Sequence, residues 1–260
     1  MITAIRAELL KIRTTPLAAA LLALAAGLNG LVAAVTSARA GSGGSLTVPP
    51  LDTTAGLRMV LTSGGFGLIL AAVLGAMVAS GEFRHHTATD TYLDQPNRAR
   101  VLAAKATTAA AAGLVLGLAA TAVTTGTGLV FATARGYPLA LPAATIARYA
   151  AGVILASGLL AAIGVGAGSL IRNQIGAVIA VLFWAFGIEQ LIGALSRTTA
   201  AYLPYTAAAT LAGARGGNGM PQVPAGLTPL PAGAVMALLA AAAVLIAAIA
   251  AATTVQRDIT

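Results

Sequence analysis

Side chains able to perform catalysis or to hold a metal ion are scarce in this sequence. It contains no cysteine, which excludes disulfides, thiolate catalysis and cysteine-based metal sites. The two histidines, His85 and His86, are adjacent, so they cannot both face one metal ion from a regular helix or strand. Lys11 and Lys105, the only lysines, follow a leucine and an alanine, whereas a Walker A loop needs Gly-Lys-Ser/Thr to cradle phosphates. We therefore expect no catalytic residue, no metal site and no cofactor bound to this chain.

Charged side chains gather instead in one segment, residues 82–105, which contains Glu82, Arg84, Asp90, Asp94, Arg98, Arg100 and Lys105. Thr87 or Thr89 is suited to cap a short helix in this segment, and Pro96 should end it. A short polar helix between two apolar runs is typical of a docking surface for another protein rather than of a catalytic pocket. The alternative interpretation is a solvated loop.

Glu189, followed by Gln190, is the one ionisable residue inside an apolar run. It precedes Leu195 by about 9 Å along a helix, at 1.5 Å per residue. A carboxylate in lipid is costly, so we expect it to face protein or water. One interpretation is that Glu189 and Gln190 line a translocation path or a dimer interface. The alternative is a hydrogen bond that packs one helix against another.

The composition excludes several classes of protein. Hydrophobic residues make up 58% of the 260 residues and charged residues 8%, and the mean hydropathy is +0.90. So few charges cannot cover a soluble domain of this size, for which about 25% is usual. The net charge of +8 is spread between apolar runs, which argues against nucleic acid as a partner and favours membrane-orientation signals.

Six apolar runs are long enough to cross a bilayer, which takes about 20 helical residues. We predict an all-α integral membrane protein with spans at residues 16–36, 61–81, 106–131, 149–170, 176–195 and 232–253, within a transmembrane domain of residues 16–253. Continuous apolarity, rich in alanine and leucine, favours helices over barrel strands. Ala38-Arg39-Ala40 resembles a signal-peptide cleavage site, but the preceding run is long, and we expect the first span to be retained.

Basic residues are about twice as dense on one side of this arrangement. Nine lie in residues 1–15, 82–105, 171–175 and 254–260, and six in residues 37–60, 132–148 and 196–231. We therefore expect both termini to lie in the cytoplasm, with the chain in the inner membrane of a bacterial cell. Within residues 1–15, Ile2, Ile5, Leu9 and Ile12 share one helical face, which predicts an amphipathic helix at the membrane surface; the alternative is a plain positive flank.

Other patterns concern the shape of the bundle. The pairs Gly113–Gly117 and Gly164–Gly168 have the spacing of close helix crossings, within one subunit or between two. The run Gly64-Gly65-Phe66-Gly67 should loosen the start of the second span. The external loop, residues 196–231, carries Tyr202 and Tyr205, which suit a membrane interface, and we expect a helix over residues 203–213.

Together these features resemble the permease subunits of type-2 ABC exporters. The similarity rests on the six spans, the amphipathic N-terminal helix and the loop pattern Glu82-x-Arg84, a threonine-rich stretch, Leu93, Pro96-x-Arg98 and Lys105. It implies that residues 82–105 hold a cytoplasmic coupling helix that docks in a groove of an ATPase subunit. The implied docking residues are Glu82, Arg84, Thr87, Thr89, Asp90, Tyr92, Leu93, Asp94, Pro96 and Arg98.

The same resemblance makes residues 1–15 the elbow helix. It also implies two six-span subunits, as a homodimer or with a related permease, and two copies of an ABC ATPase that carry ATP and Mg²⁺ on the partner chain. Two other functions stay open: an ATP-independent multi-pass transporter or channel, and a membrane anchor or immunity protein of the same family. An intramembrane enzyme is disfavoured, because both histidines fall in a predicted cytoplasmic loop rather than at membrane depth.

Overall fold

A computed structural model describes residues 2–42, 48–84, 98–138, 140–171, 173–215 and 223–253. This part of the chain is all-helical, and six of its segments are long and apolar enough to cross a membrane. The predicted class, an all-α membrane protein with six spans, is therefore confirmed. The short helix predicted between the second and third spans falls largely in residues 85–97, outside the described residues.

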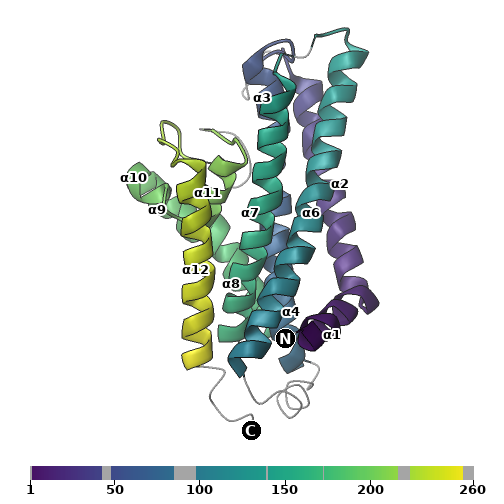
Figure 1. The fold of residues 1–260 in the computed structure, drawn as a ribbon. Helices are drawn as coiled ribbons and strands as arrows, with labels where there is room; N and C mark the ends of the chain where they lie inside the picture. The colour runs from purple at the N-terminus through teal and green to yellow at the C-terminus, as the bar shows by residue number, and fades with distance from the viewer. Residues whose placement is uncertain are drawn as a thin grey trace.

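Four of the spanning segments are single helices; the first three run between the two ends of the bundle, and the last runs from about mid-height to the lower end in Figure 1. They are α2 (Pro16–Arg39), α6 (Arg98–Ala134), α7 (Ala143–Leu170) and α12 (Ala232–Ala252). The chain alternates direction, so the C-terminal end of α2 and the N-terminal end of α7 lie at the same end, beside α3 (Thr54–Thr62). We call this the α3 end, and the opposite one, where α1 (Ile2–Thr14) lies, the α1 end.

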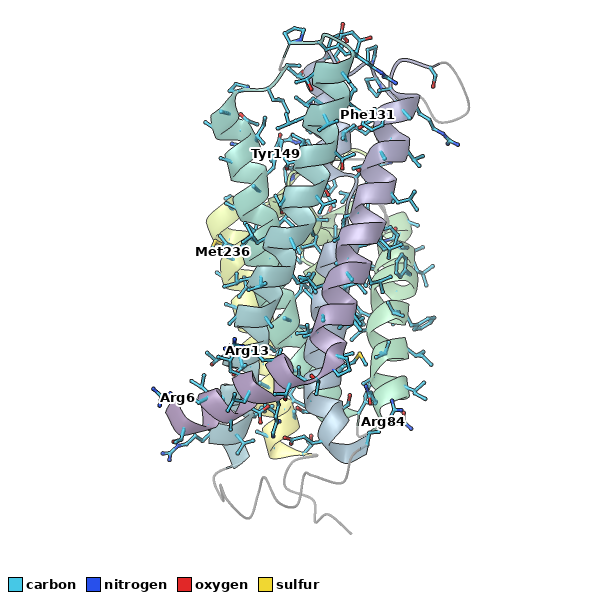
Figure 2. The ribbon with its side chains drawn as sticks, turned by 90° about the vertical axis from the view of Figure 1, so that its right-hand side faces the viewer. Arg6, Arg13, Arg84, Phe131, Tyr149 and Met236 are labelled. Carbon is cyan, nitrogen blue, oxygen red and sulfur yellow. The ribbon has the colours of Figure 1, made fainter. Side chains whose placement is uncertain are left out.

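The predicted N-terminal helix is confirmed as α1. It stops at a bend at Thr15, and Pro16 begins α2, because proline fits the first turn of a helix but not its interior. Figure 2 shows α1 lying across the end of the bundle, with Arg6 and Arg13 on it. Leu9 and Leu10 on the same helix are 42% and 61% exposed. Basic and apolar side chains thus share the surface of α1, as in helices that lie in the plane of a membrane interface.

The second and fifth spans are not continuous α-helices. The second consists of α3 and α4 (Phe66–Arg84), separated by residues 63–65, so the glycine-rich run breaks the helix rather than only loosening it. The fifth consists of α8 (Gln174–Phe183), the π-helical turn η1 (Trp184–Ile188) and α9 (Glu189–Leu195).

Helix α7 lies at the centre of the bundle, and glycines bring its neighbours close. A Cβ atom on Gly164 or Gly168 would overlap the backbone of α4, at Ala72 and Ala76. One on Gly113 would lie 2.6 Å from the Ser157 carbonyl oxygen of α7. Both glycine pairs predicted from the sequence therefore mark helix crossings within this one chain.

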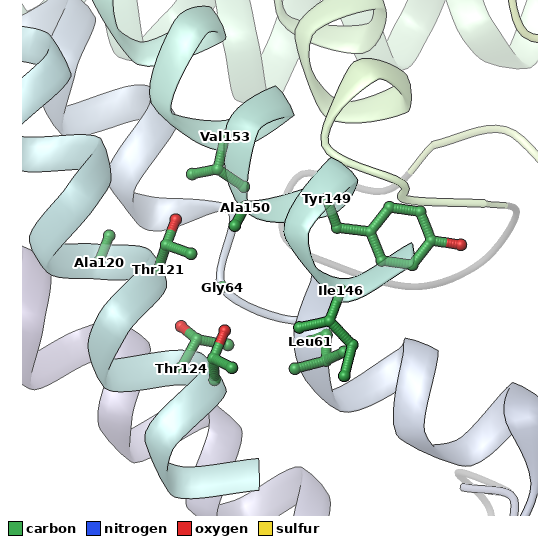
Figure 3. A pocket seen from close by; sticks show the side chains of 10 residues that line it. Leu61, Gly64, Ala120, Thr121, Thr124, Ile146, Tyr149, Ala150 and Val153 are labelled. Atoms are coloured by element: carbon green, nitrogen blue, oxygen red, sulfur yellow. The ribbon is translucent and has the colours of Figure 1, made fainter. Parts of the chain in front are cut away.

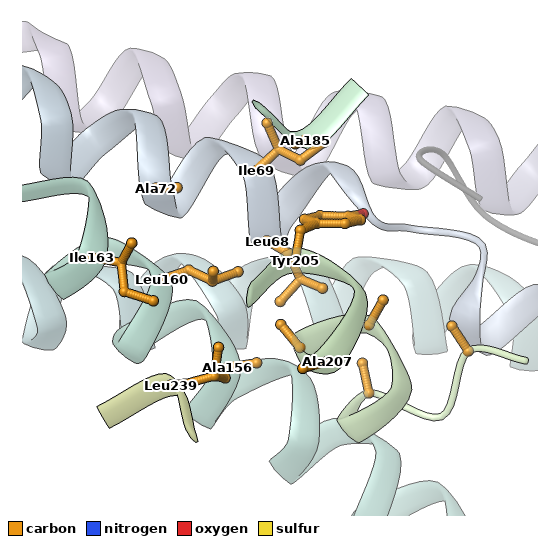
Figure 4. Close-up of a cluster of buried hydrophobic side chains, with 14 of the residues drawn as sticks. Leu68, Ile69, Ala72, Ala156, Leu160, Ile163, Ala185, Tyr205, Ala207 and Leu239 are labelled. Carbon is orange, nitrogen blue, oxygen red and sulfur yellow. The ribbon is translucent and has the colours of Figure 1, made fainter. Parts of the chain in front are cut away.

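Residues 196–215, within the predicted external loop, fold back into the bundle. After α10 (Arg197–Ala200), α11 (Pro204–Leu211) confirms the helix predicted there, and its residues 205–209 are buried against α7 and α12. The expectation for Tyr205 was wrong. Its side chain is 5% exposed and packs in the main apolar cluster with Leu68, Leu160 and Leu239 (Figure 4), whereas Tyr202 is 55% exposed.

Candidate functional site

Four charged side chains meet at the α1 end of the bundle. Lys105 Nζ of α6 lies 2.6 Å from Glu82 Oε1 of α4 and 3.1 Å from Glu8 Oε2 of α1. Lys11 Nζ lies 2.7 Å from the same Glu82 oxygen and 2.8 Å from Glu8 Oε1. We call these four residues the charge cluster. Two carboxylates and two ammonium groups balance, so the cluster carries no formal net charge.

The surrounding helices explain why the charges are held there. Glu8 and Lys11 are three residues apart on α1, so they share one helical face, which turns toward the bundle. The side chains of Glu8, Glu82 and Lys105 are only 4–8% exposed, whereas that of Lys11 is 47% exposed. Charges removed from water need partners, and each buried group here has opposite charges within 3.1 Å.

Lys11 shows the balance of forces in the cluster. Partial burial on its own lowers the pKa of Lys11, but its hydrogen bonds to Glu8 and Glu82 and the attraction of both carboxylates outweigh burial. The pKa of Lys11 is therefore raised above its ordinary value of 10.5. Lys11 therefore stays charged throughout the neutral range.

The charge cluster includes the first and last residues of the predicted docking segment, Glu82 and Lys105. Glu82 is in the last turn of α4, which ends at Arg84, and Lys105 is two turns into α6, which begins at Arg98. Their ion pair joins the C-terminal end of α4 to the N-terminal part of α6, on either side of residues 85–97 in the chain. The partners on α1 then tie this pair to the N-terminal helix.

The structure describes only part of the predicted docking set. Glu82 is turned inward, into the charge cluster, while Arg84 is exposed and donates to Gln174 Oε1 of α8 at 3.3 Å. Of Arg98 only the backbone, at the start of α6, is described. The other predicted docking residues lie outside the described residues: Thr87, Thr89, Asp90, Tyr92, Leu93, Asp94 and Pro96.

Sequence reasoning missed Glu8 and the pairing of both lysines. A signal was present, since Glu8 is the only acidic residue before Asp52 and stands three residues from Lys11. The pairing itself could not be found from spacing, because Glu82 and Lys105 are 71 and 97 residues from their partners on α1.

Glu189 forms a second buried polar centre, toward the middle of the molecule. Its carboxylate accepts hydrogen bonds from Trp184 Nε1 (2.8 Å), from the backbone N–H groups of Tyr205 (2.9 Å) and Thr206 (2.8 Å), and from Thr206 Oγ1 (2.9 Å). The residue is 1% exposed. The two carboxylate oxygens thus accept four hydrogen bonds, all from within the chain.

These bonds explain how α11 can lie inside the bundle. The first N–H groups of a helix lack partners within it, and here Glu189 accepts two of them while its charge complements the helix dipole. Gln190 Nε2 donates to Ala185 O in η1 at 3.4 Å. Glu189 therefore contacts its own chain through packing hydrogen bonds, and its main role in the described fold is to anchor α11.

Within the described residues, no group of three histidine, aspartate or glutamate side chains is placed to hold a metal ion. The charge cluster and the Glu189 centre are built from ion pairs and hydrogen bonds that position helices. Comparison with known proteins adds no name to this geometry: no protein-family model, no curated protein and no solved structure matches the chain.

Proposed function

We propose that this chain is a permease subunit of an ATP-driven exporter, working with a separate ATPase chain. The observation that carries the proposal is the charge cluster, which joins α1 to α4 and α6, the helices on either side of the polar segment 85–97 in the chain. Charged residues make up only 8% of this chain, and four of those near this end form one ion-paired unit that joins three helices. That is what a mechanical connection to another protein requires.

The geometry favours transmission of movement as one body. A force on residues 85–97 reaches α4 and α6 at their ends, and the pair of Glu82 with Lys105 keeps those ends together. Glu8 and Lys11 pass the same displacement to α1. Since α4 and α6 both pack against α7, a push at this end would rock several spans together, as in other transporters that alternate between two accesses.

The proposal assigns the sides of the membrane. The α1 end carries the denser basic residues, so it faces the cytoplasm, with both termini, in the inner membrane of a bacterial cell. The ATPase would dock there, bringing ATP and Mg²⁺ to the assembly. By the same resemblance the working unit holds two permease subunits and two ATPase copies. Apolar, aromatic-poor spans favour an amphipathic or hydrophobic cargo, such as a lipid or a peptide.

The side of the membrane on which each segment lies can be tested with single introduced cysteines, because the chain has no cysteine of its own that would react with the label. We expect Thr87→Cys to react with a membrane-impermeant maleimide only in inside-out vesicles, and Asp52→Cys, next to α3, only in right-side-out vesicles. The opposite pattern would place the docking segment outside the cell and defeat the proposal.

The coupling itself is tested by purifying the tagged chain from native membranes in mild detergent and measuring vanadate-sensitive Mg-ATP hydrolysis. We expect a stoichiometric subunit with a Walker motif, and loss of that subunit or of cargo-stimulated hydrolysis in Asp94→Ala and Arg98→Ala. Asp52→Ala, an exposed acid at the other end, is the matched control and should keep both. A wild-type preparation that transports cargo without ATP hydrolysis would favour an ATP-independent transporter instead.

A further inference from the structure

The break in the second span leaves backbone groups without helical partners. Helix α4 begins at Phe66, and the first N–H that bonds backward is that of Ile69, to Gly65 O at 3.4 Å. The N–H groups of Phe66, Gly67 and Leu68 therefore have no acceptor within their own helix. Leu68 is 2% exposed, so this first turn lies inside the bundle rather than at its surface.

A buried acceptor from another helix points at the same place. Asn29 of α2 is fully buried; its Nδ2 donates to Ala25 O at 2.7 Å, but its Oδ1 has no hydrogen-bond partner among the described residues. A Cβ atom on Gly64 would overlap Asn29 Oδ1, and would lie 2.9 Å from Thr124 Oγ1. The amide oxygen of Asn29 is thus aimed into the break. A buried polar atom left unpaired costs about 1–3 kcal/mol.

Two small cavities flank Gly64. One, between α6 and α7, is lined by Thr121, Thr124 and Tyr149 (Figure 3); the other lies toward Leu68 and Tyr205. The space for the centre of a water molecule is about 10 Å³ in the first and about 20 Å³ in the second. One water needs roughly 10–15 Å³ by this measure and two to four polar partners.

Polar groups that could bind water line both cavities. Thr121 Oγ1, which lines the first cavity, is a second buried oxygen without a hydrogen-bond partner among the described residues. In the second cavity, Tyr205 Oη donates to Gly65 O at 3.3 Å, so the break is in contact with the polar centre around Glu189. The lining of both cavities contains no charged side chain.

We propose that the break between α3 and α4 is a binding site for ordered water. A water there accepts from the first N–H groups of α4 and donates to Asn29 Oδ1, and a second one donates to or accepts from Thr121 Oγ1. Neutral oxygens and cavities of this size suit water better than a cation, which would need several more oxygen ligands. Water-bridged groups can exchange partners, so α3 can tilt against α4 without breaking a helical hydrogen bond. The site stands whether or not the chain works with an ATPase.

The test is X-ray hydroxyl-radical footprinting of the full chain in lipid nanodiscs, read by mass spectrometry, since radicals formed from bound water modify the side chains beside it. Leu68, which lines a cavity, and Leu239, which lines neither, are 2% and 0% exposed and lie in the same apolar cluster. We expect several-fold faster modification of Leu68 than of Leu239. Equal rates would overturn the proposal.

Two variants sharpen the result. Asn29→Leu removes the unpaired acceptor, and Thr121→Val removes an unpaired hydroxyl while keeping the shape of the side chain. We expect modification of Leu68 to fall several-fold toward the Leu239 rate in Asn29→Leu, and modification of Tyr149 to fall in Thr121→Val. If Asn29→Leu does not fold, Thr121→Val and the wild-type ratio decide. Unchanged modification rates in both variants would overturn the proposal. It would also be overturned, in favour of a bound cation, if Na⁺ or K⁺ raised the thermal stability of the wild type but not of the variants, relative to choline.

Discussion

Replacing Lys105 by methionine should be the most damaging single change in the charge cluster. Methionine fills nearly the same volume but leaves Glu8 and Glu82 with one remaining partner, Lys11. Both carboxylates stay in place at 6–8% side-chain exposure. The perturbation therefore tests whether buried charges hold α1 against the bundle.

The magnitude follows from burial. Removing one partner of a buried ion pair costs about 3–5 kcal/mol, because the other charge is left uncompensated. Lys11 lies within 2.8 Å of both acids and retains part of the compensation, so we expect a loss near the lower limit, about 3 kcal/mol. Lys11→Met is the matched control. Its side chain is 47% exposed and Lys105 still pairs with both acids, so we expect a loss of about 1 kcal/mol or less.

Unfolding can be followed through the single tryptophan. Trp184 Nε1 donates to Glu189, far along the chain from the charge cluster, so its fluorescence reports the fold without touching the substituted site. Titration from mild detergent into SDS gives the free energy of unfolding for each variant. If Lys105→Met is no less stable than Lys11→Met, buried charge does not hold α1 against the bundle. A double-mutant cycle with Glu82→Gln should also give a coupling energy above about 1 kcal/mol, as expected for groups in contact.

Three further outcomes are expected. Gly164→Ala puts a methyl group against the Ala72 carbonyl and should lower stability in the SDS titration by about 1–3 kcal/mol, whereas Gly126→Ala, with open space around it in α6, should be neutral or stabilising. Glu189→Gln keeps the shape but turns an N–H₂ group toward N–H donors, so α11 should detach, with a changed Trp184 emission and a loss of about 2–3 kcal/mol; unchanged emission would count against the anchor. The pKa of Lys11 is raised in the folded chain, so the stability that Lys11 contributes is complete below pH 10.5 and is lost only as the pH rises through the folded-state pKa. The difference in melting temperature between the wild type and Lys11→Met should therefore be constant from about pH 6 to 9.

The six spans could be predicted because a bilayer imposes a length. Each run of about 20 apolar residues gave a helix or a pair of helices in the expected place, from α2 to α12. The break at residues 63–65 was only hinted at by its glycines. Apolar residues continue on both sides of it, so periodicity gives no sign that α3 and α4 are separate helices.

The polar centres were beyond sequence reasoning for a different reason. The need for Glu189 to face protein or water was clear from the cost of a charge in lipid. The hydrogen-bond donors to Glu189 could not be predicted, because Tyr205 and Thr206 lie 16 and 17 residues later, on a helix that turns back into the bundle. Glu82 was identified as part of a polar segment, and its burial depends on Glu8 and Lys11 of α1, which sequence patterning placed at a membrane surface.

All three glutamates of the chain are buried, and each fixes a helix that does not span the membrane by itself. Glu8 and Glu82 hold α1 across the end of the bundle, and Glu189 holds α11 inside it. Lipid surrounds apolar helices as readily as other apolar helices do, so hydrophobic contact alone does not fix where such a short element lies. A buried charge with a defined set of hydrogen-bond donors does fix the position of a short helix, because the charge would have no partner if the helix lay anywhere else. In a chain this apolar, the three buried glutamates therefore specify where the short helices lie, and substitutions that remove them should displace those helices.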